Sequence, residues 1–301
     1  MKVLLLKGGP DAEREVSLMS GGQVAAALRR AGVDVNEVII DRPTLAELRD
    51  MSGDVVFPVL HGPWGEGGGM QELLAQDGRP YVGCEAAAAR LAMDKPLSKR
   101  AVAEVGVPTP ASQVVRAGDS LTLQPPLVLK PCDEGSSVDL RVCQSPEEVQ
   151  RGLAELLPRR PVLLAESFIR GRELTIGMLP DRELPLIEVR PKSGLYDFEA
   201  KYRRDDTEYL LDPELPAGVE DAIRRHARAA WNRLGLRDVA RMDFMLDARG
   251  PWFLEANTMP GFTDHSLVPK AARHAGISME MLVRGMAERA LARGTTATVA
   301  R

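Results

Sequence analysis

The chain has 301 residues, of which 44% are hydrophobic and 27% charged, with a formal net charge of −4 at pH 7. These proportions are ordinary for a soluble globular protein of about two or three domains, and the slight acidity argues against a broad nucleic-acid-binding surface. The three cysteines form no CxxC pair, which predicts free thiols in a reducing cytoplasm. The apolar N-terminal run is too short for a signal peptide, and no stretch approaches the length of a membrane span.

The first third of the chain reads as strands that alternate with helices. Short apolar runs predict strands at residues 3–6, 38–40 and 55–60, and helical spacing predicts helices at 20–30 and 45–49. Such alternation is typical of a parallel sheet covered on both faces. Ligands of these sheets bind at the carboxyl ends of the strands, so the loops that follow the strands are candidate binding sites.

Two loops occupy that position, at residues 8–17 and 61–69. The second, HGPWGEGGG, has five glycines in nine residues. This composition predicts a backbone that bends sharply and lets a ligand approach, although a mobile surface loop has the same composition. Glu13 and His61 lie in these loops. Each is ambiguous by itself, because a histidine directly after an apolar strand is more often structural than catalytic.

Beyond Pro108 the pattern changes to strand-like segments with few helices, which predicts an α+β architecture. Lys130 ends one apolar strand, and a small Gly/Ser loop follows at residues 134–137. Its backbone N–H groups and hydroxyls, with the lysine nearby, suit a phosphate, but a plain β-turn explains the same residues equally well. Residues 196–209 are polar with little periodicity, which is typical of either a lid or a solvated face.

Residues 240–257 predict a hairpin of two strand-like segments joined by the turn sequence Asp-Ala-Arg-Gly. Side chains alternate along a strand, so Arg241, Asp243 and Met245 share one face of the first segment. By the same rule, one face of the second segment carries Phe253, Glu255 and Asn257.

The spacing also predicts which residues face each other across the hairpin. Folding it about Arg249 places Asp243 opposite Glu255 and Arg241 opposite Asn257, unless a bulge shifts the register. Facing Cβ atoms lie about 5 Å apart, so the two carboxylates require either a proton or a cation between them. With the Asn257 amide oxygen they form an all-oxygen set that suits Mg²⁺; the alternative is a solvated polar face with an accidental acidic pair.

Several common signatures of nucleotide-binding proteins and hydrolases are missing. The chain has no GxxxxGK[ST] loop, no GxGxxG turn, no GxSxG elbow and no HExxH helix. These absences disfavour a P-loop NTPase, a Rossmann dehydrogenase, an α/β-hydrolase and a zincin. Any phosphate binding must therefore use another architecture.

Seven blocks stand out in order along the chain: GGPDAEREVSLMSG, LHGPWGEGGGMQ, MDKPLSK, VLKPCDEGSSV, YDFEAKY, RMDFMLD and LEANTMPGFTDHSLVP. Together they resemble the D-alanine–D-alanine ligases, members of the ATP-grasp superfamily, and the resemblance covers nearly the whole chain. It implies an α/β N-terminal substrate-binding domain at residues 1–84, followed by two α+β domains that form an ATP-grasp fold. The central subdomain would span 85–177 and the C-terminal catalytic subdomain 178–301, with a lid loop at 191–209.

The activity that the resemblance implies is ATP-dependent ligation of two D-alanine molecules to D-alanyl-D-alanine through an acyl phosphate. ADP and phosphate would be released, and the product would serve peptidoglycan precursor synthesis. The transferred phosphoryl group then needs positive charge, the tetrahedral intermediate needs donors for its oxyanion, and the acyl phosphate needs shelter from water. The resemblance also implies two Mg²⁺ ions, with Mn²⁺ as a possible substitute, and a cytoplasmic homodimer without nucleic-acid or membrane partners.

Roles for the substrate-binding residues follow from the same resemblance. Glu13 would bind the ammonium group of the first D-alanine, and His61 would lie near its carboxylate. Ser266, with help from Lys201, would take the carboxylate of the second D-alanine. A hydrogen-bonded set between the substrate loop and the lid would consist of Glu13, Ser136 and Tyr202.

The resemblance likewise implies that Lys95 and Lys130 contact the phosphates of ATP and that Lys201 reaches them from the lid. Arg241 and the backbone N–H of Gly261 would stabilise the oxyanion. The adenine and ribose pocket would be lined by Glu166, Phe168, Ile169 and Glu173. The two Mg²⁺ ions would be held by Asp243, Glu255 and Asn257, with Glu255 bridging them.

Three positions depart from the family pattern. The family commonly has an acid after Glu66, where this chain has Gly67, and the resulting triple glycine predicts a looser loop. A glycine usually follows GSSV, where this chain has Asp139, which puts the rigidity of that loop in question. Trp64 occupies a position that is usually smaller or polar.

Two other functions stay open from the sequence. A D-alanine–D-lactate ligase, or another D-amino-acid ligase of the same fold, would differ mainly at the second substrate site and in the lid. The lid sequence Glu-Ala-Lys-Tyr at residues 199–202 favours an amine nucleophile. A non-catalytic nucleotide-binding protein is the alternative of another class, and the presence of Lys130, Arg241 and Asp243 argues against it.

Overall fold

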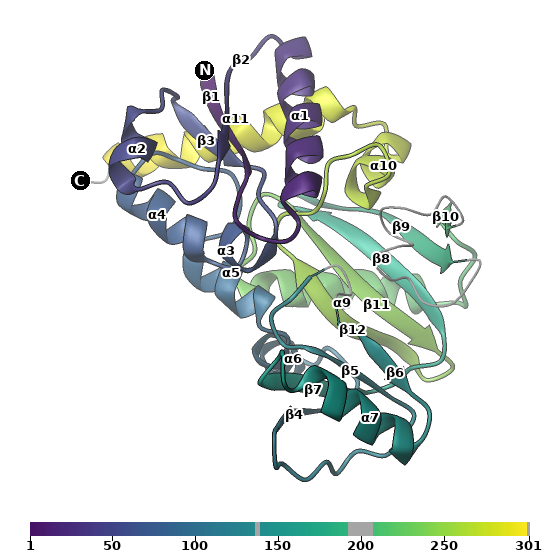
Figure 1. The fold of residues 1–301 in the computed structure, drawn as a ribbon. Helices are drawn as coiled ribbons and strands as arrows, with labels where there is room; N and C mark the ends of the chain where they lie inside the picture. The colour runs from purple at the N-terminus through teal and green to yellow at the C-terminus, as the bar shows by residue number, and fades with distance from the viewer. Residues whose placement is uncertain (136–138, 192–206, 300–301) are drawn as a thin grey trace.

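The computed structural model describes residues 1–135, 139–191 and 207–299, with side chains up to residue 294. This part of the chain forms three sheets with helices packed around them (Figure 1). The N-terminal elements are β1 (Lys2–Gly8), α1 (Arg14–Arg30), β2 (Asp34–Ile40), α2 (Leu45–Asp50), β3 (Val55–Pro58), α3 (Gly62–Gly65) and α4 (Gly69–Asp77).

The N-terminal sheet is parallel, in the order β2-β1-β3, as the alternating pattern predicts. Val3 and Leu5 of β1 belong to a core that includes residues of α1. Their neighbours Leu4 and Leu6 belong to a second core, with residues of α2 and α4. All four side chains are fully buried, so the apolar run of β1 reflects a strand covered on both faces.

The glycine-rich segment after β3 forms the short helix α3 and the start of α4 rather than an open loop. A Cβ atom at Gly67 would lie 2.3 Å from the carbonyl oxygen of Pro63. Gly68 has a φ of +111°, a conformation that favours glycine. The looser loop expected at Gly67 stays a prediction, but in this structure the glycine lets the backbone close into a turn where a Cβ atom would collide with Pro63.

A five-stranded antiparallel sheet, in the order β10-β9-β8-β11-β12, lies beyond the first sheet (Figure 1). Met242, Phe244 and Leu246 share the face opposite to that of Arg241 and Asp243, and they form a core with Ile223 and Trp231. The strands are β8 (Arg172–Leu179), β9 (Arg182–Pro191), β10 (Thr207–Leu211), β11 (Ala240–Asp247) and β12 (Gly250–Asn257). Residues of three helices complete this core: α5 (Ala86–Met93), α6 (Lys95–Ala103) and α9 (Val219–Leu234).

A smaller antiparallel sheet has the order β4-β7-β5-β6. One helix packs on it because Val149 and Leu156 on its apolar side join Val115, Leu129 and Leu163 in a separate core. The elements are β4 (Ser112–Arg116), β5 (Leu127–Pro131), β6 (Arg141–Cys143), α7 (Pro146–Leu156) and β7 (Val162–Ser167).

The C-terminal helices return toward the N-terminal sheet. α10 (Leu267–His274) packs against β8 and β9, and α11 (Met279–Val299) lies against α1 and β3 (Figure 1). The predicted domain limit at residue 177 falls within strand β8, which begins at Arg172 and belongs wholly to the five-stranded sheet. The domain limits at residues 84 and 177 stay predictions.

Most of the predicted lid loop, residues 192–206, lies outside the described residues, as do residues 136–138. The end of that predicted loop, residues 207–209, is part of β10 and pairs with β9. Within the described ranges, no helix is both long and apolar enough to cross a membrane.

The hairpin formed by β11 and β12 has the predicted partners. Asp243 lies opposite Glu255, and Arg241 lies opposite Asn257. Strand β8 pairs with the other edge of β11, so the hairpin is an integral part of the five-stranded sheet. The acidic pair is therefore held on rigid strands, which is the support that a binding site requires.

A β-bulge changes which side chains of β12 share a face. Phe244 pairs with Phe253, so Leu254 is an extra residue on β12. The rings of Phe244 and Phe253 meet edge to face in the core, with centroids 5.7 Å apart. The expectation that Phe253 shares a face with Glu255 and Asn257 is wrong, because the extra residue reverses the alternation between them.

Candidate active site

Two adjoining pockets lie between these units. The first pocket is formed where the loops after β1 and β3 meet the end of β12 and the loop that follows it. The inter-sheet pocket lies between the four-stranded and the five-stranded sheets, with lining residues from both. Lys95, Glu134 and Glu255 line both pockets and mark the place where the pockets meet.

Every described residue of the predicted site lines one of the two pockets. In the first pocket these are Glu13, His61, Lys95, Arg241, Glu255, Asn257, Gly261 and Ser266. In the inter-sheet pocket they are Lys95, Lys130, Glu166, Phe168, Ile169, Glu173, Asp243 and Glu255. The other three predicted residues, Ser136, Lys201 and Tyr202, lie outside the described residues.

Lys95 is the first residue of α6, and the start of this helix places it where the two pockets meet. The carboxylate of Asp94 caps this helix by accepting a hydrogen bond from the backbone N–H of Leu97, at 2.9 Å. Lys95 Nζ donates to the carbonyl oxygen of Glu134 at 2.6 Å and lies 3.2 Å from Oε2 of Glu255. A cation in this position can pair with an anion that reaches from one pocket to the other.

Glu166 lies between two lysines in the inter-sheet pocket. Its Oε1 is 3.1 Å from Lys130 Nζ, and its Oε2 is 2.7 Å from Lys99 Nζ. Burial raises the pKa of Glu166, but the two ammonium groups outweigh burial and hold the pKa below its ordinary value. Lys99 was given no role from the sequence; its presence in the block MDKPLSK, one helical turn after Lys95, was the available signal.

Arg241 and Asp243 share one face of β11 and form an ion pair, with Nη2 2.9 Å from Oδ2. The hydroxyl of Thr175 on the neighbouring strand β8 donates to Oδ1 of Asp243 at 2.7 Å. These contacts fix the carboxylate of Asp243 toward the pocket rather than toward solvent. Arg241 lines the first pocket and Asp243 the inter-sheet pocket, so the ion pair crosses the boundary between them.

The donor set on this hairpin suits a hard divalent cation. Asp243 and Glu255 face each other, and the amide of Asn257 follows two residues along β12. Carboxylate and amide oxygens are the ligands that Mg²⁺ prefers. In the part of the chain that the structure describes, no three His, Cys, Asp or Glu side chains converge as metal ligands, so Asn257 would be the third protein donor.

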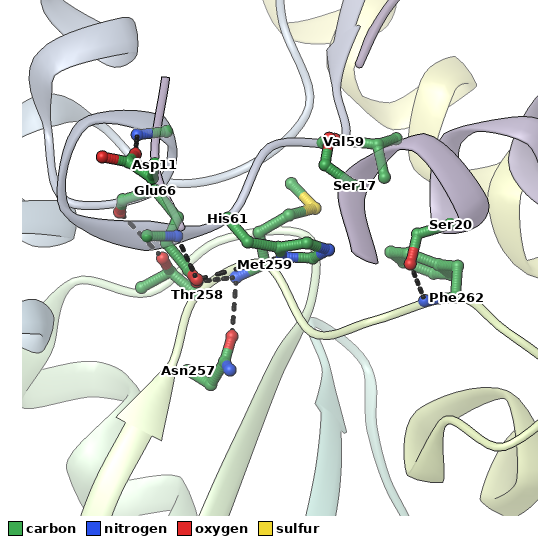
Figure 2. Close-up of polar contacts among 12 residues, drawn as sticks. Asp11, Ser17, Ser20, Val59, His61, Glu66, Asn257, Thr258, Met259 and Phe262 are labelled. Carbon is green, nitrogen blue, oxygen red and sulfur yellow. Dashed lines mark hydrogen bonds and ion pairs between the residues drawn. The ribbon is translucent and has the colours of Figure 1, made fainter. Parts of the chain in front are cut away.

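The glycine-rich segment is tied to the loop after β12 through Glu66 (Figure 2). The carboxyl group of Glu66 accepts hydrogen bonds from the backbone N–H groups of Gly62 and Met259, both at 3.2 Å. The Thr258 hydroxyl donates to the backbone carbonyl oxygen of Glu66. Burial, reinforced by the charge of Glu13, raises the pKa of Glu66 to about 8, so the group is protonated at neutral pH. Sequence reasoning assigned Glu66 no role, and its place as the one acid of a glycine-rich loop was the only signal.

His61 lies beside Glu66, with its Nδ1 3.9 Å from the carboxyl Oε1 (Figure 2). Burial lowers the pKa of His61 to about 4, so the imidazole is neutral at pH 7. Its Nε2 is buried and has no hydrogen-bond partner among the described residues. A buried polar atom of this kind is normally satisfied, so a bound ligand would supply the missing partner.

The loop after β12 is held by hydroxyl groups. The Ser20 hydroxyl accepts a hydrogen bond from the backbone N–H of Phe262 at 3.1 Å (Figure 2). The Ser266 hydroxyl accepts one from the backbone N–H of Thr263 at 2.9 Å. A Cβ atom at Gly261 would lie 2.7 Å from Ser266 Oγ, so glycine is needed for this close approach.

The loops on the two sides of the site also touch. A Cβ atom at Gly135 would lie 3.1 Å from Oε2 of Glu13, so the loop after β5 reaches the loop after β1.

Asp139, on the far side of residues 136–138, has a φ of +56° where a glycine is usual. Its carboxylate pairs with Arg159 at 3.2 Å and Arg160 at 3.0 Å, and Arg160 also pairs with Glu134 at 2.7 Å.

Comparisons with known proteins place the chain in a family. A family model described as "D-ala D-ala ligase C-terminus" matches residues 109–288. A D-alanine–D-alanine ligase of Syntrophotalea carbinolica is 40% identical over 94% of this chain and 93% of its own length. One from Bordetella petrii is 43% identical over 92% of this chain and 88% of its own.

Solved structures extend the similarity to the whole fold. A D-alanine–D-alanine ligase structure from Bacillus anthracis is 28% identical, with a TM-score of 0.88 and 99% of both chains covered. A second structure from that organism, complexed with ATP, has a TM-score of 0.85 with the same identity and coverage. The relatives and the solved structures that match this mixed α/β chain of three sheets are ligases, so the chain is a ligase. The chain belongs to the D-alanine–D-alanine ligase family.

Proposed function

We propose that the protein ligates two D-alanine molecules to D-alanyl-D-alanine with the conversion of ATP to ADP and phosphate, for peptidoglycan precursor synthesis. The observation that carries this proposal is the meeting of the two pockets at Lys95, Glu134 and Glu255. A nucleotide in the inter-sheet pocket and a carboxylate in the first pocket would come together there, which turns an encounter in solution into an aligned reaction. Family membership supplies the identity of the substrates.

ATP would lie between the two antiparallel sheets, in an ATP-grasp fold of two α+β domains that follow the α/β N-terminal domain. The proposed limits are 1–84, 85–177 and 178–301. Lys130 and Lys95 would contact the phosphates, with Lys201 added from a lid within residues 191–209. The adenine and ribose would be held by Glu166, Phe168, Ile169 and Glu173. The similarity to a ligase solved with ATP supports the binding of ATP by this chain.

The first half of the reaction would use the first pocket and the junction. Glu13 would hold the ammonium group of the first D-alanine, and neutral His61 would direct its orphaned Nε2 toward the carboxylate. The carboxylate oxygen would attack the γ-phosphorus of ATP, and the bond to the β-phosphate would break as ADP forms. Lys95 would offset the charge that builds on the transferred group.

In the second half, the amine of the second D-alanine would attack the acyl carbon of the acyl phosphate. Ser266 would hold the carboxylate of this second substrate. Arg241 and the backbone N–H of Gly261 would stabilise the oxyanion of the tetrahedral intermediate, which collapses to the dipeptide and phosphate. The proposed hydrogen-bonded set of Glu13, Ser136 and Tyr202 would keep water from the acyl phosphate.

Asp243, Glu255 and Asn257 would hold Mg²⁺, as two ions bridged by Glu255, with Mn²⁺ as a substitute. The bound cations would neutralise the phosphate oxygens during transfer. Arg241 pairs with Asp243 in this structure and lines the first pocket, from which it would stabilise the oxyanion. The protein would act as a cytoplasmic homodimer.

The test is phosphate release by the purified protein with ATP, Mg²⁺ and D-alanine, with the product identified by mass. The expected result is one phosphate for each D-alanyl-D-alanine formed. D-lactate in place of the second D-alanine serves as the competing acceptor. Phosphate release only with D-lactate or another acceptor would contradict the assigned substrate. Binding of ATP without turnover of any acceptor would indicate a non-catalytic nucleotide-binding protein instead.

A further inference from the structure

Lys99 lies behind the inter-sheet pocket and lines neither pocket. It is on α6, four residues after Lys95, so the two ammonium groups project from the same side of the helix. Its residue exposure is only 2%. An ammonium group buried this deeply must serve a nearby anion, because desolvation of an uncompensated charge is costly.

The anion that Lys99 serves is Glu166. Lys99 Nζ is 2.7 Å from Oε2 of Glu166 and donates to the backbone carbonyl of Phe253 at 3.2 Å. Phe253 is the residue directly before the bulge at Leu254. Lys99 therefore links the carboxylate on the four-stranded sheet to the irregular part of the hairpin on the five-stranded sheet.

Glu166 has a second cation, Lys130, and the two lysines differ in one respect. Lys130 lines the inter-sheet pocket and can reach a ligand there, whereas Lys99 cannot. If Lys130 were the only cation on Glu166, turning it toward a phosphate would leave a buried carboxylate without compensation, which is strongly unfavourable. With Lys99 in place, one cation stays with Glu166 while the other moves.

We propose that Lys99 is a positioning residue that acts as the permanent counter-ion of Glu166 and thereby leaves Lys130 available to the phosphates of a nucleoside triphosphate. This inference rests on the proposed ATP site. Lys99 touches no substrate, and its effect on ATP passes entirely through Glu166 and Lys130. Burial lowers the pKa of Lys99 to about 8, with Glu166 opposing the shift, so the lysine is still mostly charged at neutral pH.

The experiment compares ATP affinity, measured by calorimetry with Mg²⁺ and without D-alanine, in the wild type, Lys99→Met, Lys99→Arg, Glu166→Gln and the double variant Lys99→Met/Glu166→Gln. Lys99→Met should bind ATP about 10- to 100-fold more weakly, by analogy with the loss seen when an outer-shell partner of a metal ligand is removed. Lys99→Arg should recover most of the loss, because it keeps the charge.

The double variant separates this role from a merely structural one. Once Glu166 is neutral, Lys99 has no charge to balance, so the double variant should match Glu166→Gln within about threefold, an affinity difference of less than 1 kcal/mol. A further loss of the size caused by Lys99→Met alone would overturn the inference, as would wild-type affinity in Lys99→Met. If Lys99→Met fails to fold, the comparison of the double variant with Glu166→Gln still decides.

Lys7→Met is the matched control, because Lys7 also pairs with a glutamate, Glu37 at 2.5 Å, but lines neither pocket. It should leave ATP affinity unchanged. A wild type that binds ATP but releases no phosphate with any acceptor would overturn the ligase proposal alone, since the affinity series would still test Lys99. A wild type that binds no ATP would overturn both.

Discussion

The carboxyl group of Glu66 accepts a hydrogen bond from the backbone N–H of Met259 at 3.2 Å, although 193 residues separate them in the chain. This contact joins the glycine-rich segment of the N-terminal unit to the loop that carries Gly261 and Ser266. Burial of this carboxyl between the two segments, reinforced by the charge of Glu13, raises its pKa to about 8, although the hydrogen bonds from Gly62 and Met259 oppose the rise. Packing between units therefore sets the charge of a group in the first pocket.

The pH dependence of stability should show this raised pKa. Between about pH 4.5 and 8 the folded chain holds a proton on Glu66 that the unfolded chain has lost, so stability falls as pH rises. His61 has a folded pKa of about 4 against an ordinary 6.5, so it raises stability with pH, but only up to about pH 6.5. The Glu66 effect is therefore separated from that of His61 between about pH 6.5 and 8.

Glu66→Gln removes the titrating group. The free energy of unfolding of the variant, measured by urea denaturation, should rise relative to the wild type from pH 6.5 to 8, by at most about 1.4 kcal/mol per pH unit. Glu47→Gln is the control, because Glu47 is exposed, belongs to the capping box of α2 with the N-cap Thr44, and has a pKa lowered below 4.5 by backbone and side-chain hydrogen bonds from Thr44. Parallel curves for Glu66→Gln and the wild type would contradict a protonated Glu66.

Asp243→Asn tests the proposed metal site. The change removes one anionic ligand but keeps an oxygen that can accept the hydrogen bond from Thr175, so the fold should stay intact. The turnover number should fall at least about tenfold, and half-maximal activity should need more Mg²⁺. Phosphate release against Mg²⁺ concentration measures both, with exposed Asp221→Asn as the control. Near-normal activity at every Mg²⁺ concentration would remove Asp243 from the site.

Gly67→Ala tests the tight turn in the glycine-rich segment. A Cβ atom would lie 2.3 Å from the Pro63 carbonyl oxygen, so the backbone must shift, at a cost of about 1–3 kcal/mol in unfolding free energy. Gly22→Ala is a control of opposite sign. It lies within α1 with only Lys7 Nζ near, at 4.0 Å, so alanine should stabilise the chain by up to about 1 kcal/mol. Equal effects of the two substitutions in chemical denaturation would contradict the tight packing.

Asp139→Gly and Asp139→Ala separate backbone strain from ion pairing. Glycine relieves the left-handed φ of +56°, which costs a non-glycine residue about 1–2 kcal/mol, and loses the partly exposed pairs with Arg159 and Arg160, worth about 0–1 kcal/mol each. The glycine variant should therefore be close to the wild type in unfolding free energy. Alanine keeps the strain and loses the pairs, so it should be less stable than glycine. A variant order with alanine more stable than glycine would contradict strain at position 139, and a large loss of stability in both variants would show that the ion pairs outweigh the strain.

The hairpin of the candidate site could be predicted from local pattern. The partners across the hairpin, Asp243 with Glu255 and Arg241 with Asn257, followed from spacing alone. The face of Phe253 could not be predicted, because a bulge depends on how the strand packs and not on alternation. The role of Lys99 could not be predicted for a similar reason, because only the packing of α6 against β7 shows that its ammonium group is buried against a carboxylate.

The parallel sheet at the start of the chain could be inferred from local pattern, since a strand buried on both faces is apolar throughout. The family could be inferred as well, since seven blocks in order carry that resemblance. Three features appear only in the folded chain: Leu254 is an extra residue, Glu66 is protonated and Glu166 has two cations. Burial and charge balance depend on segments far apart in the chain, such as residues 66 and 259, and no local pattern records which of them meet.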